Sequence, residues 1–176
     1  MFFLALSAIA LTAMAPVEQR GQSIHSDPPL SVTRAAATPA SPVYVDAIDY
    51  PANEGGWDAF YDLERRLARD FDDVCGDTFC EGEYSNIKHL RYRCSVRAAD
   101  GVMGECIWTF AGSNQEVDEA SGKVVVDGRI WECRSPIVAG TTISEFYRAL
   151  AGREAIHSRL PHGGRSIYDG LIDCGF

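Results

Sequence analysis

The fold is decided by residues 87–110, which read IKHLRYRCSVRAADGVMGECIWTF. From Ile87 to Arg97 apolar and basic residues alternate, which is typical of a β-strand with one buried face. Asp100-Gly101 is a strong signal for a hairpin turn. The returning strand, residues 105–110, places one cysteine and two aromatic side chains on a single face. This stretch therefore predicts an antiparallel β-hairpin.

The register of the hairpin predicts a disulfide. If the chain turns at Asp100-Gly101, residues whose numbers sum to about 200 face each other. Cys94 then lies opposite Cys106, and Tyr92 lies opposite Trp108 as an aromatic cross-strand pair. We therefore predict a bridge between Cys94 and Cys106.

The other cysteines are interpreted around this first pair. The chain has six cysteines, and no two of them have the C-x2-C spacing of zinc or redox motifs. Cys75 and Cys80 enclose only four residues, which favours a local bridge. Cys133 and Cys174 then remain as the third pair. The alternative is that Cys75 or Cys80 is bridged to the sheet instead.

A helix is predicted before the hairpin, and a short edge strand before that helix. Residues 43–48 have the composition of an edge strand. The apolar residues of 57–74 recur every three or four positions, as on one face of a helix. They are Trp57, Phe60, Leu63, Leu67, Phe71 and Val74.

One more strand and two helices are predicted after the hairpin. We expect a polar loop over 112–122 and a strand over 123–133, with a turn or bulge at Asp127-Gly128. A capping box at Thr142 and a second, weaker cap at Ser166 predict two closing helices, the first ended by Gly152. The predicted fold class is α+β: an N-terminal amphipathic helix, a three- or four-stranded antiparallel meander and two C-terminal helices, stabilised by disulfides.

The N-terminal part is predicted to be an export signal followed by a leader. Residues 1–15 read MFFLALSAIALTAMA, an uncharged apolar run ending in an A-x-A cleavage pattern. Residues 16–56 are rich in Pro, Ala and Ser and are expected to be flexible. Residues 57–176 form the single disulfide-bonded domain. Together with the even number of cysteines, the signal predicts a periplasmic or secreted protein without a membrane span.

Charge narrows the classes of partner. The formal net charge is −9, which disfavours nucleic acid and suits a protein partner with a basic surface. Acidic residues gather around the first cysteine pair. We therefore expect a non-enzymatic binding protein, such as an inhibitor, an immunity-type protein or an envelope-associated factor. Its predicted partner-binding residues are Asp77, Glu81, Glu83 and Tyr84.

Two alternative functions follow from other side chains. The first is a small secreted hydrolase that uses His157 and His162 for acid–base chemistry, with Arg165 nearby to bind an anion. The second is a calcium-stabilised envelope protein, because calcium prefers clustered oxygen ligands. The candidate ligands for calcium are Asp73, Asp77, Glu81 and Glu83. No other cofactor is predicted.

Overall fold

The computed structural model describes residues 41–51 and 53–175. The predicted signal peptide, residues 1–15, and residues 16–40 of the predicted leader therefore lie outside the described residues. Three helices and four strands make up the domain, joined by short helical turns. In chain order they are β1 (Tyr44–Asp46), η1 (Ala47–Asp49), α1 (Glu54–Val74), η2 (Cys75–Phe79), β2 (Lys88–Arg97), β3 (Met103–Asp118), β4 (Lys123–Arg134), α2 (Ile143–Ala149), η3 (Ala155–His157) and α3 (Ile167–Cys174).

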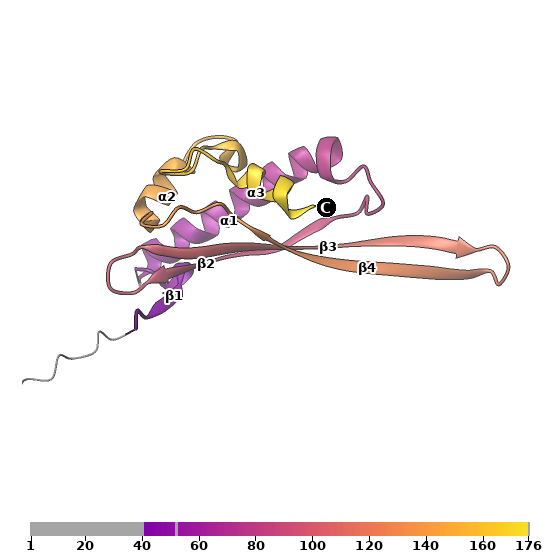
Figure 1. The fold of residues 1–176 in the computed structure, drawn as a ribbon, viewed down its shortest axis with the longest axis horizontal. Helices are drawn as coiled ribbons and strands as arrows, with labels where there is room; N and C mark the ends of the chain where they lie inside the picture. Colours follow the sequence, from indigo (N-terminus) through magenta and orange to yellow (C-terminus); the bar gives the residue numbers. More distant parts are fainter. Residues whose placement is uncertain (1–40, 52, 176) are drawn as a thin grey trace, which may run out of the picture. The chain divides into compact units, whose positions relative to one another are not determined.

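The strands form one antiparallel sheet in the order β1-β2-β3-β4, and the helices pack against one face of it (Figure 1). This arrangement confirms an α+β fold. The edge strand predicted within residues 43–48 is β1, so the ordered domain begins well before Trp57. No helix among the described residues is long and apolar enough to cross a membrane.

The hairpin formed by β2 and β3 has the predicted register. Cys94 pairs with Cys106 and Tyr92 pairs with Trp108 across the two strands. The turn contains Gly101 at φ 73°, a left-handed conformation that glycine adopts without steric cost. The prediction from residues 87–110 is confirmed.

Helix α1 supplies the core residues that cover the sheet. Phe60, Leu63, Leu67 and Phe71 have at most 1% of their surface exposed. Trp57 was expected on the same stripe, but it is 46% exposed. The helix begins earlier than predicted, behind an Asn53 cap, and the buried residue of its first turn is glycine at position 56. Gly56 lies one helical turn before Phe60 and occupies the buried face at the start of the helix. The indole of Trp57, the next residue, therefore points towards solvent.

The loop predicted over residues 112–122 is wrong. Strand β3 continues to Asp118, and β4 pairs with it without interruption from Lys123. Asp127-Gly128 is therefore part of a regular strand and forms neither a turn nor a bulge. The two strands extend beyond the helices as a two-stranded arm, which we define as residues 112–118 and 123–129 (Figure 1). Because both faces of the arm are largely solvated, its sequence lacks the alternation that marks a half-buried strand.

All three predicted disulfides are present, and the alternative bridge from the first pair to the sheet does not occur. The Cα atoms are 5.0 Å apart in Cys75–Cys80, 4.0 Å in Cys94–Cys106 and 5.2 Å in Cys133–Cys174. The last bridge ties β4 to α3. Capping boxes are confirmed at Thr142 and Ser166. Helix α2 ends at Ala149, before the predicted stop at Gly152.

Candidate functional site

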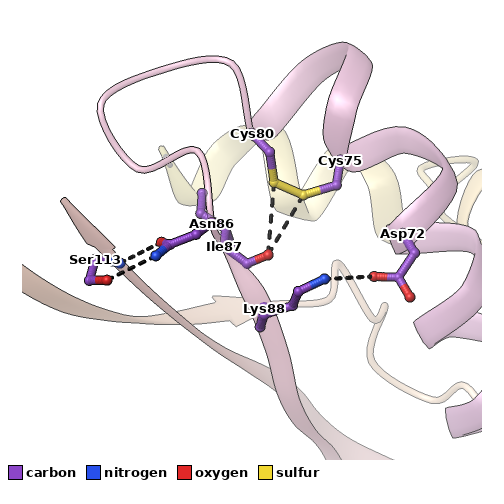
Figure 2. Close-up of a disulfide and its surroundings, with 7 residues drawn as sticks. All are labelled: Asp72, Cys75, Cys80, Asn86, Ile87, Lys88 and Ser113. Carbon is purple, nitrogen blue, oxygen red and sulfur yellow. Dashed lines mark hydrogen bonds and ion pairs between the residues drawn. A yellow bond between two sulfur atoms is a disulfide. The ribbon is translucent and has the colours of Figure 1, made fainter. Parts of the chain in front are cut away.

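The acidic loop, defined as residues 76–83, is held at its start by the core. Its first residues continue α1 as a helical turn, and the Cys75–Cys80 bridge closes this turn. Both sulfur atoms contact the carbonyl oxygen of Ile87, at 3.8 and 3.9 Å (Figure 2). Phe79 stacks on Phe71 with ring centroids 6.1 Å apart. The base of the loop is thus part of the packed interior.

Tyr84 anchors the other end of the loop. Its hydroxyl donates a 2.5 Å hydrogen bond to Oδ2 of Asp127, and its ring meets Trp131 edge-on at 5.2 Å. The hydrogen bond to the Asp127 carboxylate raises the pKa of Tyr84 above its usual value. Tyr84 was predicted as a partner contact. The structure buries its side chain to 9% exposure and places it between the loop and the arm.

A second connection ties the chain after the loop to the arm. The side chain of Asn86 accepts a 2.7 Å hydrogen bond from the Ser113 backbone N–H and donates a 2.9 Å hydrogen bond to the Ser113 hydroxyl (Figure 2). The Asn86 side chain therefore satisfies an edge position of β3 just before β2 begins at Lys88. The polar side chain replaces the strand neighbour that Ser113 lacks.

The remaining predicted partner-binding residues lie on the surface of the loop. Asp77, Glu81 and Glu83 are exposed, and no ion pair joins any of them to a residue in the described part of the chain. The nearby carboxylate of Asp72 is engaged in an ion pair. Asp72 lies 3.9 Å from the Lys88 ammonium, as Figure 2 shows. The loop therefore presents uncompensated negative charge from a fixed backbone.

A hollow of about 250 Å³ lies between the acidic loop and the arm. Phe79 and Tyr84 contribute aromatic walls, Glu83 lines the loop side and Arg129 lines the arm side. The guanidinium of Arg129 stands over the Trp131 ring, 5.6 Å from its centroid. A long aliphatic side chain with a cationic end fits this combination of aromatic walls and a carboxylate.

No protein-family model, curated protein or solved structure matches this chain.

The predicted calcium ligands are not gathered into a site. Within residues 41–51 and 53–175, no group of three or more His, Cys, Asp or Glu side chains is placed to hold a metal ion. Asp73, Asp77, Glu81 and Glu83 are spread along the exposed side of the helical turn and the loop. Calcium prefers six to eight converging oxygen ligands, and this geometry does not provide them.

His157 lies apart from the acidic loop's hollow. It lines a hollow of about 180 Å³ together with Asp70 and Asp73. Its ring packs on Tyr168 with centroids 4.6 Å apart. One of these carboxylates, that of Asp70, accepts a 3.0 Å hydrogen bond from the backbone N–H of Ile156. This carboxylate thus has a structural role in holding the turn that carries His157.

The other two candidate catalytic side chains have different partners. Nε2 of His162 is 3.7 Å from Oε2 of Glu145, the residue that completes the cap of α2. Arg165 donates a 2.5 Å hydrogen bond to Asp173 on α3. No contact within the described ranges joins these two residues to each other or to His157. The structure does not assemble the acid–base set expected from the sequence.

Two residues of the site were not found from the sequence. Asp127 and Arg129 belong to the site because the arm carries them back to the loop. One signal could have found them: Val124, which opens the apolar run 124–126, follows the connection 119–122 at the same spacing at which Val117 precedes it. Equal strand lengths around a Ser-Gly turn are typical of a hairpin.

Proposed function

We propose that this protein is an exported, non-enzymatic binding protein that captures a partner with a basic surface. The apolar N-terminus and the three disulfides support export to the periplasm or the cell exterior. An inhibitor, an immunity-type protein or an envelope-associated factor would have these properties. The binding surface is the acidic loop with the adjoining hollow.

The observation that carries the proposal is the anchoring of the loop at both ends. The Cys75–Cys80 bridge holds its start and the Tyr84–Asp127 hydrogen bond holds its end, while Asp77, Glu81 and Glu83 stay exposed. A loop that is already ordered loses little entropy on binding. Exposed charges of one sign also raise the rate of encounter with an oppositely charged surface.

The hollow supports a specific mode of contact. A lysine or arginine of the partner would lay its aliphatic stem against Phe79 and Tyr84. Its charged end would lie towards Glu83, because Arg129 lines the opposite side and repels a second cation. The hollow would thereby orient the side chain as well as attract it.

Charge reversal on the loop tests this function. The oxidised protein, immobilised on a matrix, is expected to capture basic proteins from an envelope extract of the producing cell. Glu81→Lys/Glu83→Lys should lose those proteins. The matched control is Asp49→Lys/Asp58→Lys, which makes the same change in charge at exposed positions of η1 and α1. If the loop variant captures the same proteins as the parent, the proposal is wrong.

A further inference from the structure

The outer edge of β4 is open along the arm. The strand is last in the sheet order, and no strand of the described residues pairs with its far side. The backbone N–H of Ser135 donates a 3.0 Å hydrogen bond to the Cys106 carbonyl, which sets the phase of the ladder between β3 and β4. Because antiparallel ladders alternate, the even-numbered residues of β4 direct their N–H and C=O groups away from β3. Along the arm and at its root these residues are Val124, Val126, Gly128 and Ile130, which we call the free edge.

The side chains of the free edge are apolar and exposed. Trp131 and Cys133 are buried under the helices, so the alternate residues project from the opposite face of the sheet. Val124, Val126 and Ile130 are 64%, 62% and 68% exposed. Soluble proteins usually protect an edge strand with lysine, proline or a bulge at such positions. The free edge has none of these, because the basic residues of this strand, Lys123 and Arg129, project from the other face, so its apolar open face is available to another strand.

Helix α3 limits how far a covering strand can extend. The Cα of Gly170 approaches the outward carbonyl of Arg134 so closely that an added Cβ would lie 2.5 Å from that oxygen. The carbonyl is therefore shielded by the helix. A strand added to β4 must end before Arg134.

We infer that the covering strand is β4 of a second copy of this chain, paired antiparallel about a twofold axis through Val125. In this register Lys123 of each copy faces Asp127 of the other copy on the face that carries the helices. Val124 of each copy faces Val126 of the other on the open face. The pair thus combines main-chain hydrogen bonds with two ion pairs and an apolar strip.

The neighbouring registers are disfavoured by charge or by space. An axis through Val126 would oppose Lys123 to Arg129, and an axis through Asp127 would oppose that carboxylate to its own copy. An axis through Gly128 would drive the turn of the second copy into α3. Of these registers, only the axis through Val125 avoids all three conflicts, and it also pairs Lys123 with Asp127.

A single cysteine on the axis tests the register. Residues on the axis face each other as a non-hydrogen-bonded pair with Cα atoms about 4.5 Å apart, close enough for a disulfide. The variant Val125→Cys is expected to form a covalent dimer under mild oxidation. Val117→Cys, on the other strand of the arm, is the control: it should still dimerise but should form no covalent dimer under the same conditions. Equal crosslinking of both variants, or of neither, would overturn the proposed axis.

A matched pair of proline variants tests the pairing itself. Val126→Pro removes an N–H that points away from β3. The hydrogen bonds between β3 and β4 are therefore kept, but the outer edge of β4 loses a donor for a second strand. Val117→Pro is the matched control, because it removes an N–H that points away from β4, on the outer edge of β3. In sedimentation equilibrium over a wide concentration range, the parent and Val117→Pro should reach twice the monomer mass, and Val126→Pro should remain monomeric. A monomeric parent at every concentration, or dimerisation of Val126→Pro equal to that of the parent, would refute the inference.

Discussion

The hydroxyl of Tyr84 donates a 2.5 Å hydrogen bond to the carboxylate of Asp127, 43 residues away in the sequence. This contact joins the end of the acidic loop to the strand that carries the free edge. The ring of Tyr84 also packs on Trp131, which is the first buried residue of β4 after the arm. The orientation of the loop therefore depends on the arm, and the two surfaces proposed for binding share one anchor.

Removing the Tyr84 hydroxyl should loosen the acidic loop without unfolding the domain. Tyr84→Phe keeps the aromatic packing on Trp131 but leaves the Asp127 carboxylate without its donor. We expect faster amide hydrogen exchange over residues 81–86 and a lower Tm. Tyr61→Phe, at a 45% exposed position on α1, is the control and should change neither. Unchanged exchange in Tyr84→Phe would show that the loop is held by other contacts.

The three disulfides should contribute unequally to stability. In the loop-entropy model, the stabilisation grows with the length of chain that a bridge closes. The separations are 5, 12 and 41 residues for Cys75–Cys80, Cys94–Cys106 and Cys133–Cys174. Replacing each pair by serine should cost about 2, 3 and 4 kcal/mol, respectively. Urea unfolding of the three double variants measures this order, and a reversed order would contradict the entropic account.

The parts of the fold with a strong local pattern could be predicted from the sequence. The Asp100-Gly101 turn determines the hairpin register, and the register brings Cys94 opposite Cys106. The side chains of Thr142 and Ser166 likewise mark the starts of α2 and α3, because each bonds backbone groups only three residues away. In each case neighbouring residues specify the backbone without help from distant contacts.

The first strand of the arm, residues 112–118, and the composition of the site could not be predicted in this way. These residues are largely solvated on both faces, so no alternation of polar and apolar residues distinguishes them from a loop, whereas the strand predicted over 123–133 is present as β4. Tyr84 illustrates the same difficulty. Its position beside two glutamates suggests a surface residue, but its burial depends on Asp127 and Trp131, which only the arm brings near.

Gly170 is predicted to be indispensable for docking α3 on β4. A Cβ at this position would lie 2.5 Å from the Arg134 carbonyl oxygen and 3.1 Å from Cδ of Pro136. Gly170→Ala should therefore lower the free energy of unfolding by about 1–3 kcal/mol, although alanine favours helices. Gly76→Ala is the control, because nothing lies within 4 Å of its added Cβ. Thermal unfolding of both variants checks the prediction, and equal Tm values would contradict it.

Stability should decrease at alkaline pH because buried tyrosines resist ionisation. Burial raises the pKa of Tyr92 above its usual range and raises the pKa of Tyr147 to about 12. In the unfolded chain both hydroxyls ionise with the ordinary tyrosine pKa of about 10. Above that pH the unfolded state releases protons that the folded state retains, so the free energy of unfolding falls between pH 10 and about 12. Urea titrations at stepwise pH measure the decrease.

Tyr147→Phe separates this effect from general alkaline denaturation. The Tyr147 hydroxyl oxygen is buried and has no hydrogen-bond partner among the residues that the structure describes. Its removal should leave stability at neutral pH unchanged or raise it by up to about 1 kcal/mol, because an unsatisfied polar group leaves the interior. The decrease above pH 10 should become shallower, because one late-titrating group is gone. Tyr61→Phe, on the exposed side of α1, should keep the parental slope. If both variants show the same slope as the parent, Tyr147 does not ionise late in the folded protein.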